Sequence, residues 1–300
     1  MLRLVKLLSA VISAGLIIVV AAQAPSFAAT RAAGIIGAWV SGSSAAWETA
    51  DSAFGPLQDA RIFYPKALPA SYAGSAGSNL PSGVTLVVSY NTPDTNVSSY
   101  VCSVPSTRNV ILAFYHEPEN QHSPFASGAG FVTEFDAQSA EIRQAALTCG
   151  VTTVKVAMIT MTWAYANSTR RGYGCSFIPP AANVDYYLGD TYEKNQDTLA
   201  HDPGFQRWLT CTSTSGLVPQ GLAEYGVGLG NTTKTGCQFT DQQRASVIQT
   251  DAAYLTANFP NFAMWSYSWV TGSQCWDDWQ FPTGGASATT WQNIATGAIP

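Results

Sequence analysis

Short apolar runs recur along the chain, and each one ends at polar residues, glycine or proline. Their β-branched and aromatic residues are typical of strands that are buried on both faces. Breaks rich in Gly, Pro, Ser and Thr separate them, so each run predicts a separate strand. The predicted strands span residues 34–40, 59–64, 84–91, 110–115, 151–159, 184–192, 219–226 and 261–269.

Helix signals lie between several of these runs. Thr133 predicts the cap of a helix with an apolar stripe, and Gly150 stands where a left-handed residue would end it. Pro203, preceded by Asp, predicts the first turn of another helix. Thr240 forms a capping box for a helix that runs to about Asn258, and a short helix is expected near the carboxyl end. The segment between the fifth and sixth strands looks irregular, so its helix should be short or lost.

Strands that alternate with helices predict a parallel sheet, and eight strands are the number at which such a sheet closes into a barrel. No internal repeat or long linker interrupts the pattern. The fold class expected is therefore α/β, a (β/α)8 TIM barrel, with residues 29–300 as one catalytic domain.

The amino-terminal residues predict a secretory signal peptide. Arg3 and Lys6 precede an apolar run over residues 7–22, and small residues flank Phe27 before a cleavage site after Ala28. Residues 1–28 would then be removed, and the mature protein would be secreted, extracellular and without a membrane segment. The length of the apolar run leaves an uncleaved anchor as the alternative.

Composition restricts the ligand. Charged residues make up 11% of the chain and the net charge is −5, with no basic patch for nucleic acid or phosphate. Nine Trp, thirteen Tyr and thirteen Phe suit a neutral, ring-shaped ligand. No His-rich cluster suggests a metal, so no cofactor is expected, and the partner should be a polysaccharide or oligosaccharide bound by a monomer.

The six cysteines include no Cys-x-x-Cys, and in an oxidising compartment they predict disulfides. Cys102 and Cys149 precede the fourth and fifth strands, so both lie near one rim of the barrel. Cys237 and Cys275 follow the seventh and eighth strands at the opposite rim, which leaves Cys175 with Cys211. Glycosylation sequons begin at Asn96, Asn167 and Asn231.

Two glutamates stand where strands end. The run 110–115 stops at His116-Glu117-Pro118, because Pro118 has no amide hydrogen to continue a ladder, and Glu224 lies at the exit of the run 219–226. Barrel enzymes carry their active sites at these carboxyl ends. Glycoside hydrolysis needs two carboxyl groups that flank the scissile bond. We therefore expect Glu117 and Glu224 to form a glycosidase site.

The segments Tyr115-His116-Glu117-Pro118-Glu119, residues 189–192 (Gly-Asp-Thr-Tyr) and residues 221–226 (Gly-Leu-Ala-Glu-Tyr-Gly) resemble the fourth, sixth and seventh strand motifs of glycoside hydrolase family 26. The resemblance covers most of the mature chain in the right order, and the set of three motifs is more specific than any one of them. It implies a retaining barrel glycosidase of clan A.

The resemblance also implies roles for individual residues. Glu117 would be the acid/base and Glu224 the nucleophile. His116 would contact the substrate, and Tyr192 would donate a hydrogen bond to the nucleophile. Trp265 would form the floor of the sugar subsite beside the scissile bond. Residues 120–125 lack the Trp that mannan-cleaving members often carry, so β-mannan, β-1,3-xylan and β-glucan all remain open as substrates of an endo-acting enzyme.

Other residues complete the expected pocket. Arg61 ends a strand in a chain with few charges and is expected to bind a carboxylate at the barrel mouth. With Tyr192 it should keep Glu224 ionised at low pH, while the pKa of Glu117 should rise. Stacking platforms for sugars, some of which would instead belong to the core, are Trp39, Trp163, Trp269, Trp276 and Trp279.

Other functions fit the sequence less well. A catalytically inactive carbohydrate-binding barrel would keep the aromatic groove without turnover, although both glutamates are present. A polysaccharide lyase or esterase would need a Tyr or Ser base and a basic groove. A Ser-His-Asp triad has only His116, His122 and His201 to draw on, and no Gly-x-Ser-x-Gly elbow occurs.

Overall fold

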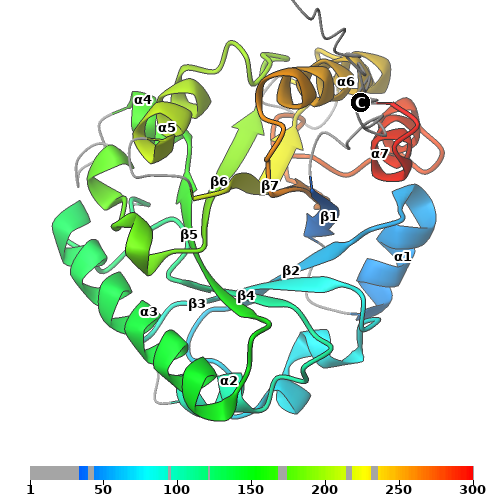
Figure 1. Cartoon of the computed structure of the whole chain (residues 1–300). Coiled ribbons are helices and arrows are strands. Elements are labelled where there is room, and N and C mark those ends of the chain that lie inside the picture. The colour runs from blue at the N-terminus through cyan, green and yellow to red at the C-terminus, as the bar shows by residue number, and fades with distance from the viewer. Residues whose placement is uncertain are drawn as a thin grey trace, which may run out of the picture. The chain divides into compact units, whose positions relative to one another are not determined.

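Eight parallel strands close into a barrel in chain order (Figure 1). The barrel closes where β1 pairs with both β2 and β8. The predicted (β/α)8 barrel is confirmed, and all eight predicted strands are present. The strands are β1 (Ile35–Trp39), β2 (Asp59–Tyr64), β3 (Thr85–Tyr90), β4 (Val110–Phe114), β5 (Val154–Met161), β6 (Tyr186–Glu193), β7 (Gln220–Val227) and β8 (Met264–Ser268).

The computed structural model describes residues 34–39, 44–93, 96–120, 122–167, 174–213, 218–230 and 236–299. The predicted signal peptide and the sequon at Asn231 lie outside these ranges. Within them, no helix has the length and apolarity needed to cross a bilayer.

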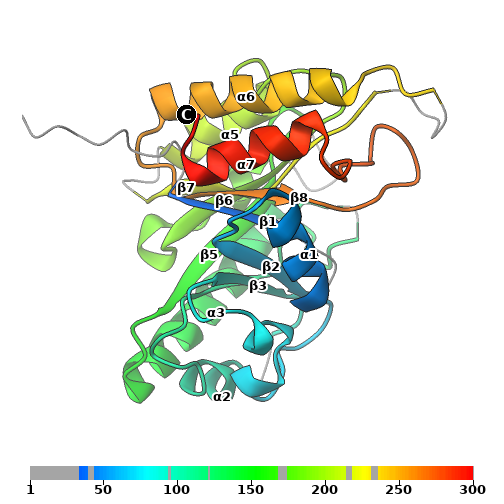
Figure 2. The same cartoon turned by 90° about the vertical axis from the view of Figure 1, so that its right-hand side faces the viewer.

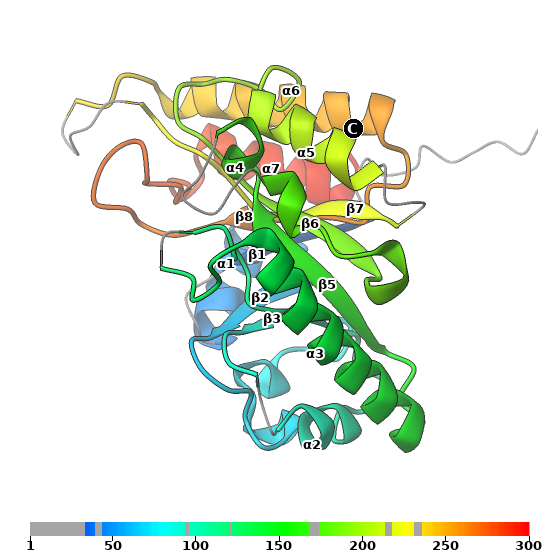
Figure 3. The ribbon, with the colours of Figure 1, turned by 90° about the vertical axis from the view of Figure 1, so that its left-hand side faces the viewer.

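Seven α-helices are found in the described residues, and they lie around the strands (Figures 2 and 3). Neither α1 nor α2 was predicted from the sequence. Between β5 and β6 only a four-residue α-helix and two 3-10 turns remain, as the irregular sequence there predicted. The helices are α1 (Ser44–Phe54), α2 (Val97–Cys102), α3 (Gly128–Cys149), α4 (Trp163–Ala166), α5 (Pro203–Ser213), α6 (Asp241–Asn258) and α7 (Ala286–Thr296).

Helix caps follow the local sequence, with one correction. The capping box of Thr240 and the left-handed Gly150 after α3 are both present. The predicted cap at Thr133 is wrong, because α3 begins five residues earlier at Gly128. Ser127 is extended there, and its Oγ accepts a hydrogen bond from the Gly130 amide at 3.2 Å. Thr133 instead donates its hydroxyl to the Ala129 carbonyl inside the helix.

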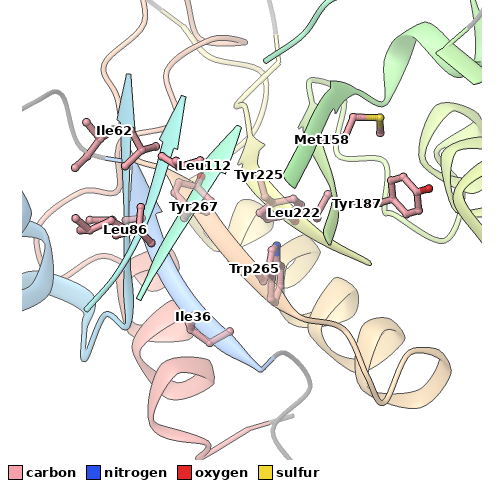
Figure 4. Packing of buried hydrophobic residues seen from close by; sticks show 14 of the residues in the cluster. Ile36, Ile62, Leu86, Leu112, Met158, Tyr187, Leu222, Tyr225, Trp265 and Tyr267 are labelled. Carbon is pink, nitrogen blue, oxygen red and sulfur yellow. The ribbon is translucent and has the colours of Figure 1, made fainter. Parts of the chain in front are cut away.

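The strands bury two separate apolar layers, because successive side chains point to opposite faces. The larger layer lies between the strands and the helices, and Figure 4 shows part of it, including Leu112, Leu222 and Trp265. The smaller layer fills the barrel interior. Its fully buried members are Val87, Ile111, Ala113, Ala157, Ile159, Leu188, Ala223 and Met264.

A β-bulge in β7 decides which face Glu224 occupies. Leu222 pairs with Gly189 and Glu224 pairs with Asp190, so Ala223 is an extra residue in the ladder. The register against β8 shifts at the same point. Ala223 and Glu224 therefore both face the barrel interior, while Tyr225 returns to the helix layer and donates to Asp251 of α6.

Candidate active site

Glu117 follows β4 on a sharply turned loop. Both Tyr115, at φ 46°, and Glu117, at φ 53°, occupy the left-handed region that side chains other than glycine rarely adopt. The Glu117 amide donates to the Ile159 carbonyl of β5 at 2.9 Å. Asn120 Nδ2 donates to Glu117 Oε2 at 3.2 Å. The loop thus holds a half-buried carboxyl group at the carboxyl end of the barrel, where the sequence predicted it.

Glu224 is 4% exposed and has two strong partners. Tyr192, which points inward from β6, donates its hydroxyl to Glu224 Oε2. Arg61, which points inward from β2, brings its Nε to 3.7 Å from Glu224 Oε1. The predicted contacts of Tyr192 and Arg61 with this carboxylate are confirmed, although Arg61 lies within β2 and not at its end.

Arg61 is itself buried at 2% exposure. Two residues earlier in β2, the Asp59 carboxyl group accepts a hydrogen bond from the Ser266 hydroxyl of β8, which lies 2.8 and 2.7 Å from its two oxygens. Burial raises the pKa of Asp59 to about 7. The guanidinium also lies over the Phe63 ring, 4.1 Å from its centroid. The positive charge of Arg61 therefore acts on more than one inward-facing carboxyl group, including Asp59 and Glu224.

The carboxyl groups of the site all bind protons more tightly than usual. Burial raises the pKa of Glu224 to about 7, more than Arg61 and the Tyr192 hydrogen bond lower it. Burial also raises the pKa of Glu117, as expected in direction. The expectation that Arg61 and Tyr192 keep the pKa of Glu224 low is wrong, because loss of water outweighs one cation and one hydroxyl.

Asp190 is a third carboxyl group at the site. It is fully buried, pairs in register with Glu224, and has no hydrogen-bond donor on either oxygen among the described residues. Burial first, and then the negative charges of Glu224 and Glu117, raise the pKa of Asp190 far above its usual value. Burial and the two glutamates therefore disfavour a further negative charge on Asp190.

His116 packs against Phe63, with ring centroids 4.8 Å apart. Burial and the nearby Arg61 lower the pKa of His116 to about 3, so the imidazole is neutral at physiological pH. Its Nδ1 is buried and has no partner among the described residues. Trp39 also packs against Phe63, with centroids 5.1 Å apart, so a continuous group of rings joins Trp39 to His116, the residue beside Glu117.

Trp265 does not reach this site, so its predicted role as a subsite floor is wrong. It is fully buried on the outer face of β8, where it packs against Tyr225 (Figure 4). It also packs against Trp291 of α7. Strand alternation turns Ser266 inward and Trp265 outward. Trp269 packs against Phe54 of α1 at 5.4 Å, and the structure does not bring it to the glutamates. Trp163, by contrast, is 55% exposed at the start of α4, just after β5.

Trp279 is the aromatic residue beside Tyr192, which donates to Glu224. It stacks on Tyr192 with centroids 4.4 Å apart and an interplanar angle of 24°. Gly226 permits this approach, since a Cβ there would meet the indole at 2.8 Å. In the sequence, Trp279 was one of several tryptophans after the eighth strand, and nothing distinguished it from its neighbours.

The three predicted disulfides are all present: Cys102–Cys149, Cys175–Cys211 and Cys237–Cys275. The last one joins the loop after β7 to the loop after β8, which carries Trp279. A backbone hydrogen bond from Leu229 to Cys275, at 2.8 Å, supports the same junction. Over the described ranges, no cluster of His, Cys, Asp and Glu could hold a metal ion.

No family model matches the chain, and no curated protein matches it in sequence. Solved structures share its fold. A family 128 (subgroup I) endo-β-1,3-glucanase from Amycolatopsis mediterranei, in complex with laminarihexaose, has a TM-score of 0.54 and 14% identity over 89% of this chain and 100% of that one. A modular family 26 endo-β-1,4-mannanase from Cellulomonas fimi has a TM-score of 0.55 and 12% identity over 89% and 71%.

A third similar structure is a family 128 (subgroup VII) oligosaccharide-binding protein from Trichoderma gamsii, with a TM-score of 0.53 and 12% identity over 90% of this chain and 96% of that one. At these identities the likeness shows the barrel fold alone. Enzymes and a binding protein both occur among these structures, so function must be argued from the site.

Proposed function

We propose that this chain is a secreted, monomeric, retaining glycoside hydrolase that cleaves β-linked polysaccharide, with Glu117 as acid/base and Glu224 as nucleophile. The observation that carries the proposal is the environment of Glu224. An inward-facing carboxylate with a buried Arg61 and a Tyr192 hydroxyl on its two oxygens is oriented and partly ionised. Glu117, at the same carboxyl end of the barrel, influences the titration of Glu224.

The reaction would take place in two displacements. A Glu224 oxygen attacks the anomeric carbon while Glu117 gives its proton to the departing glycosidic oxygen, and a glycosyl ester forms on Glu224. Glu117, now ionised, then takes a proton from water, and that water attacks the anomeric carbon and releases Glu224. The two carboxyl groups should be about 5–5.5 Å apart for this geometry.

The aromatic residues suggest where sugars bind. Trp279, on the Tyr192 side, would stack on the sugar that becomes attached to Glu224, and Trp39 and His116 would contact it from the opposite wall. The exposed Trp163 would serve a more distant sugar unit. Structural neighbours that are named as an endo-β-1,3-glucanase and an endo-β-1,4-mannanase support a neutral β-glycan, and β-mannan, β-1,3-xylan and β-glucan are the candidates.

The second candidate function is carbohydrate binding without turnover, which the oligosaccharide-binding neighbour favours. One experiment separates the two. The purified protein and its Glu224→Gln variant are incubated with mannan, β-1,3-xylan, laminarin and mixed-linkage glucan, and released reducing ends are measured. Release by the native protein alone, with the β-anomer formed first by NMR, supports the retaining enzyme. Binding of a glycan with no release by either protein would make the chain a binding protein.

A further inference from the structure

The loop that carries Glu117 needs a support that the catalytic pair does not supply. Two residues other than glycine, Tyr115 and Glu117, have positive φ within three positions. Such conformations are unfavourable for residues with a side chain and persist only where the surroundings enforce them. The regular pairing of β4 with β5 ends at Leu112 and Val156, so the ladder does not reach the strained residues.

Glu119 provides that support. Its Oε1 accepts a hydrogen bond from the Met161 amide at the end of β5. The next amide, that of Thr162, donates to the backbone carbonyl of Asp190 in β6 at 3.0 Å. Amides of a central strand point alternately to its two neighbours, so the Met161 amide faces the side of β4. The Glu119 carboxyl group therefore stands where a backbone carbonyl of a longer β4 would be.

The Glu119 side chain is 3% exposed and is not used by the proposed mechanism. Its second oxygen, Oε2, is buried, and none of the described residues donates to it. The titratable groups that interact electrostatically with Glu119 are Glu117 on its own loop, Tyr165 of α4 and Asp190 of β6. Burial raises the pKa of Glu119 well above its usual value, so the surroundings favour its protonated form.

We propose that Glu119 is a positioning residue that fixes the acid/base Glu117 by joining its loop to the end of β5. The proposal rests on the proposed function. The Met161 contact from Glu119 and the Ile159 contact from the Glu117 amide hold the loop at two points, two residues apart on each side. Between them lies the backbone of Glu117, whose carboxyl direction depends on its unusual φ. Burial disfavours the charged form of Glu119, so this support opposes a further negative charge beside the catalytic pair.

The test compares Glu119→Ala, Glu119→Gln and native protein on two substrates. The polysaccharide needs the proton of Glu117 to depart, whereas an aryl glycoside with a good leaving group does not. Misplacement of a catalytic group by about 1 Å costs about a hundredfold. We expect Glu119→Ala to lower kcat/KM about a hundredfold on polysaccharide and far less on the aryl glycoside. Glu119→Gln keeps the acceptor oxygen and should stay close to native on both, with an unchanged basic limb of the pH profile.

Glu193→Gln is the matched control, since it removes another buried carboxyl group on the outer face of β6. An equal loss on both substrates for Glu119→Ala, or native activity on both, would overturn the proposal. If Glu119→Ala does not fold, the Gln variant decides: a basic limb that moves to lower or higher pH would mean that Glu119 acts by charge. A native protein without activity on any glycan would instead refute the proposed function. Native activity that is lost in Glu117→Ala but kept in Glu119→Ala would refute this inference alone.

Discussion

Arg61 Nε lies 3.7 Å from Glu224 Oε1, and both side chains are buried. A buried charge without a partner is costly, so the charge on each group stabilises the opposite charge on the other. Arg61 favours an ionised Glu224, and burial opposes it. The result is a carboxyl group that changes protonation near neutral pH and is held in one direction by Tyr192.

The roles of the two glutamates can be separated with azide. Glu224→Ala should abolish hydrolysis, and azide should then give a product of inverted configuration, since the small anion fills the space of the nucleophile. Glu117→Ala should keep its first step on substrates with good leaving groups, and azide should give a retained product. NMR of the glycosyl azides distinguishes the outcomes. Full activity in both variants would reject the assignment.

The pH profile should be bell-shaped, because the reaction needs Glu224 ionised and Glu117 protonated at once. Burial raises the pKa of both groups, so the acid limb should lie above the ordinary carboxyl value of 4.5. The two limbs belong to the pair. Glu224→Gln should lower the Glu117 pKa measured by carbon-13 NMR, since a negative neighbour is removed. An unchanged or higher pKa would show that the two glutamates do not share a site.

Two tryptophans should respond in opposite ways to removal. Trp279→Ala should raise KM roughly tenfold and leave the melting temperature close to native, since its ring is half-buried beside Tyr192. Trp265→Ala should lower the free energy of unfolding by about 3–5 kcal/mol, since its ring is fully buried against Trp291. Kinetics and chemical denaturation of both variants test this. A Trp265→Ala variant that folds as well as native would contradict the outward orientation.

The disulfides allow a comparison between the two ends of the barrel. Replacing Cys237 and Cys275 by Ser should lower stability by about 2–4 kcal/mol and also raise KM, because the loop with Trp279 loses its link. Replacing Cys102 and Cys149, which join the ends of α2 and α3, should lower stability by a similar amount without changing KM. Equal effects of the two replacements on KM would show that the Cys237–Cys275 disulfide does not organise the site.

Stability should fall as the pH rises from about 4 to about 7. The pKa values of Asp59 and Asp251 are raised to about 7 by burial, so in this range the folded state holds protons that the unfolded state has released. The free energy of unfolding then decreases with pH. Urea denaturation at pH 5 and pH 8 measures the difference, and Asp251→Asn should reduce it. A higher stability at pH 8 in the native protein would contradict these shifts.

The sequence alone determined the order of the strands, the closed barrel and the strand ends that carry Glu117 and Glu224. Each of these follows from local signals: short apolar runs, a proline that ends a strand, and the count of eight. Two disulfide pairs also followed, since parallel strands assign each loop to one rim, and the two remaining cysteines made the third pair. The sequence did not predict the helix over residues 44–54.

Only the tertiary structure decided which side chains meet. Trp265 and Trp279 are alike in sequence, yet alternation along β8 turns the first toward the helices, and the loop after β8 returns the second to Tyr192. The inward direction of Glu224 depends on one extra residue in β7, which local patterns do not reveal. The pKa of Glu224 depends on how much water the surrounding strands exclude, and the link from Glu119 to Met161 joins residues 42 positions apart. Such properties arise from burial and long-range contact, which exist only once the barrel has closed.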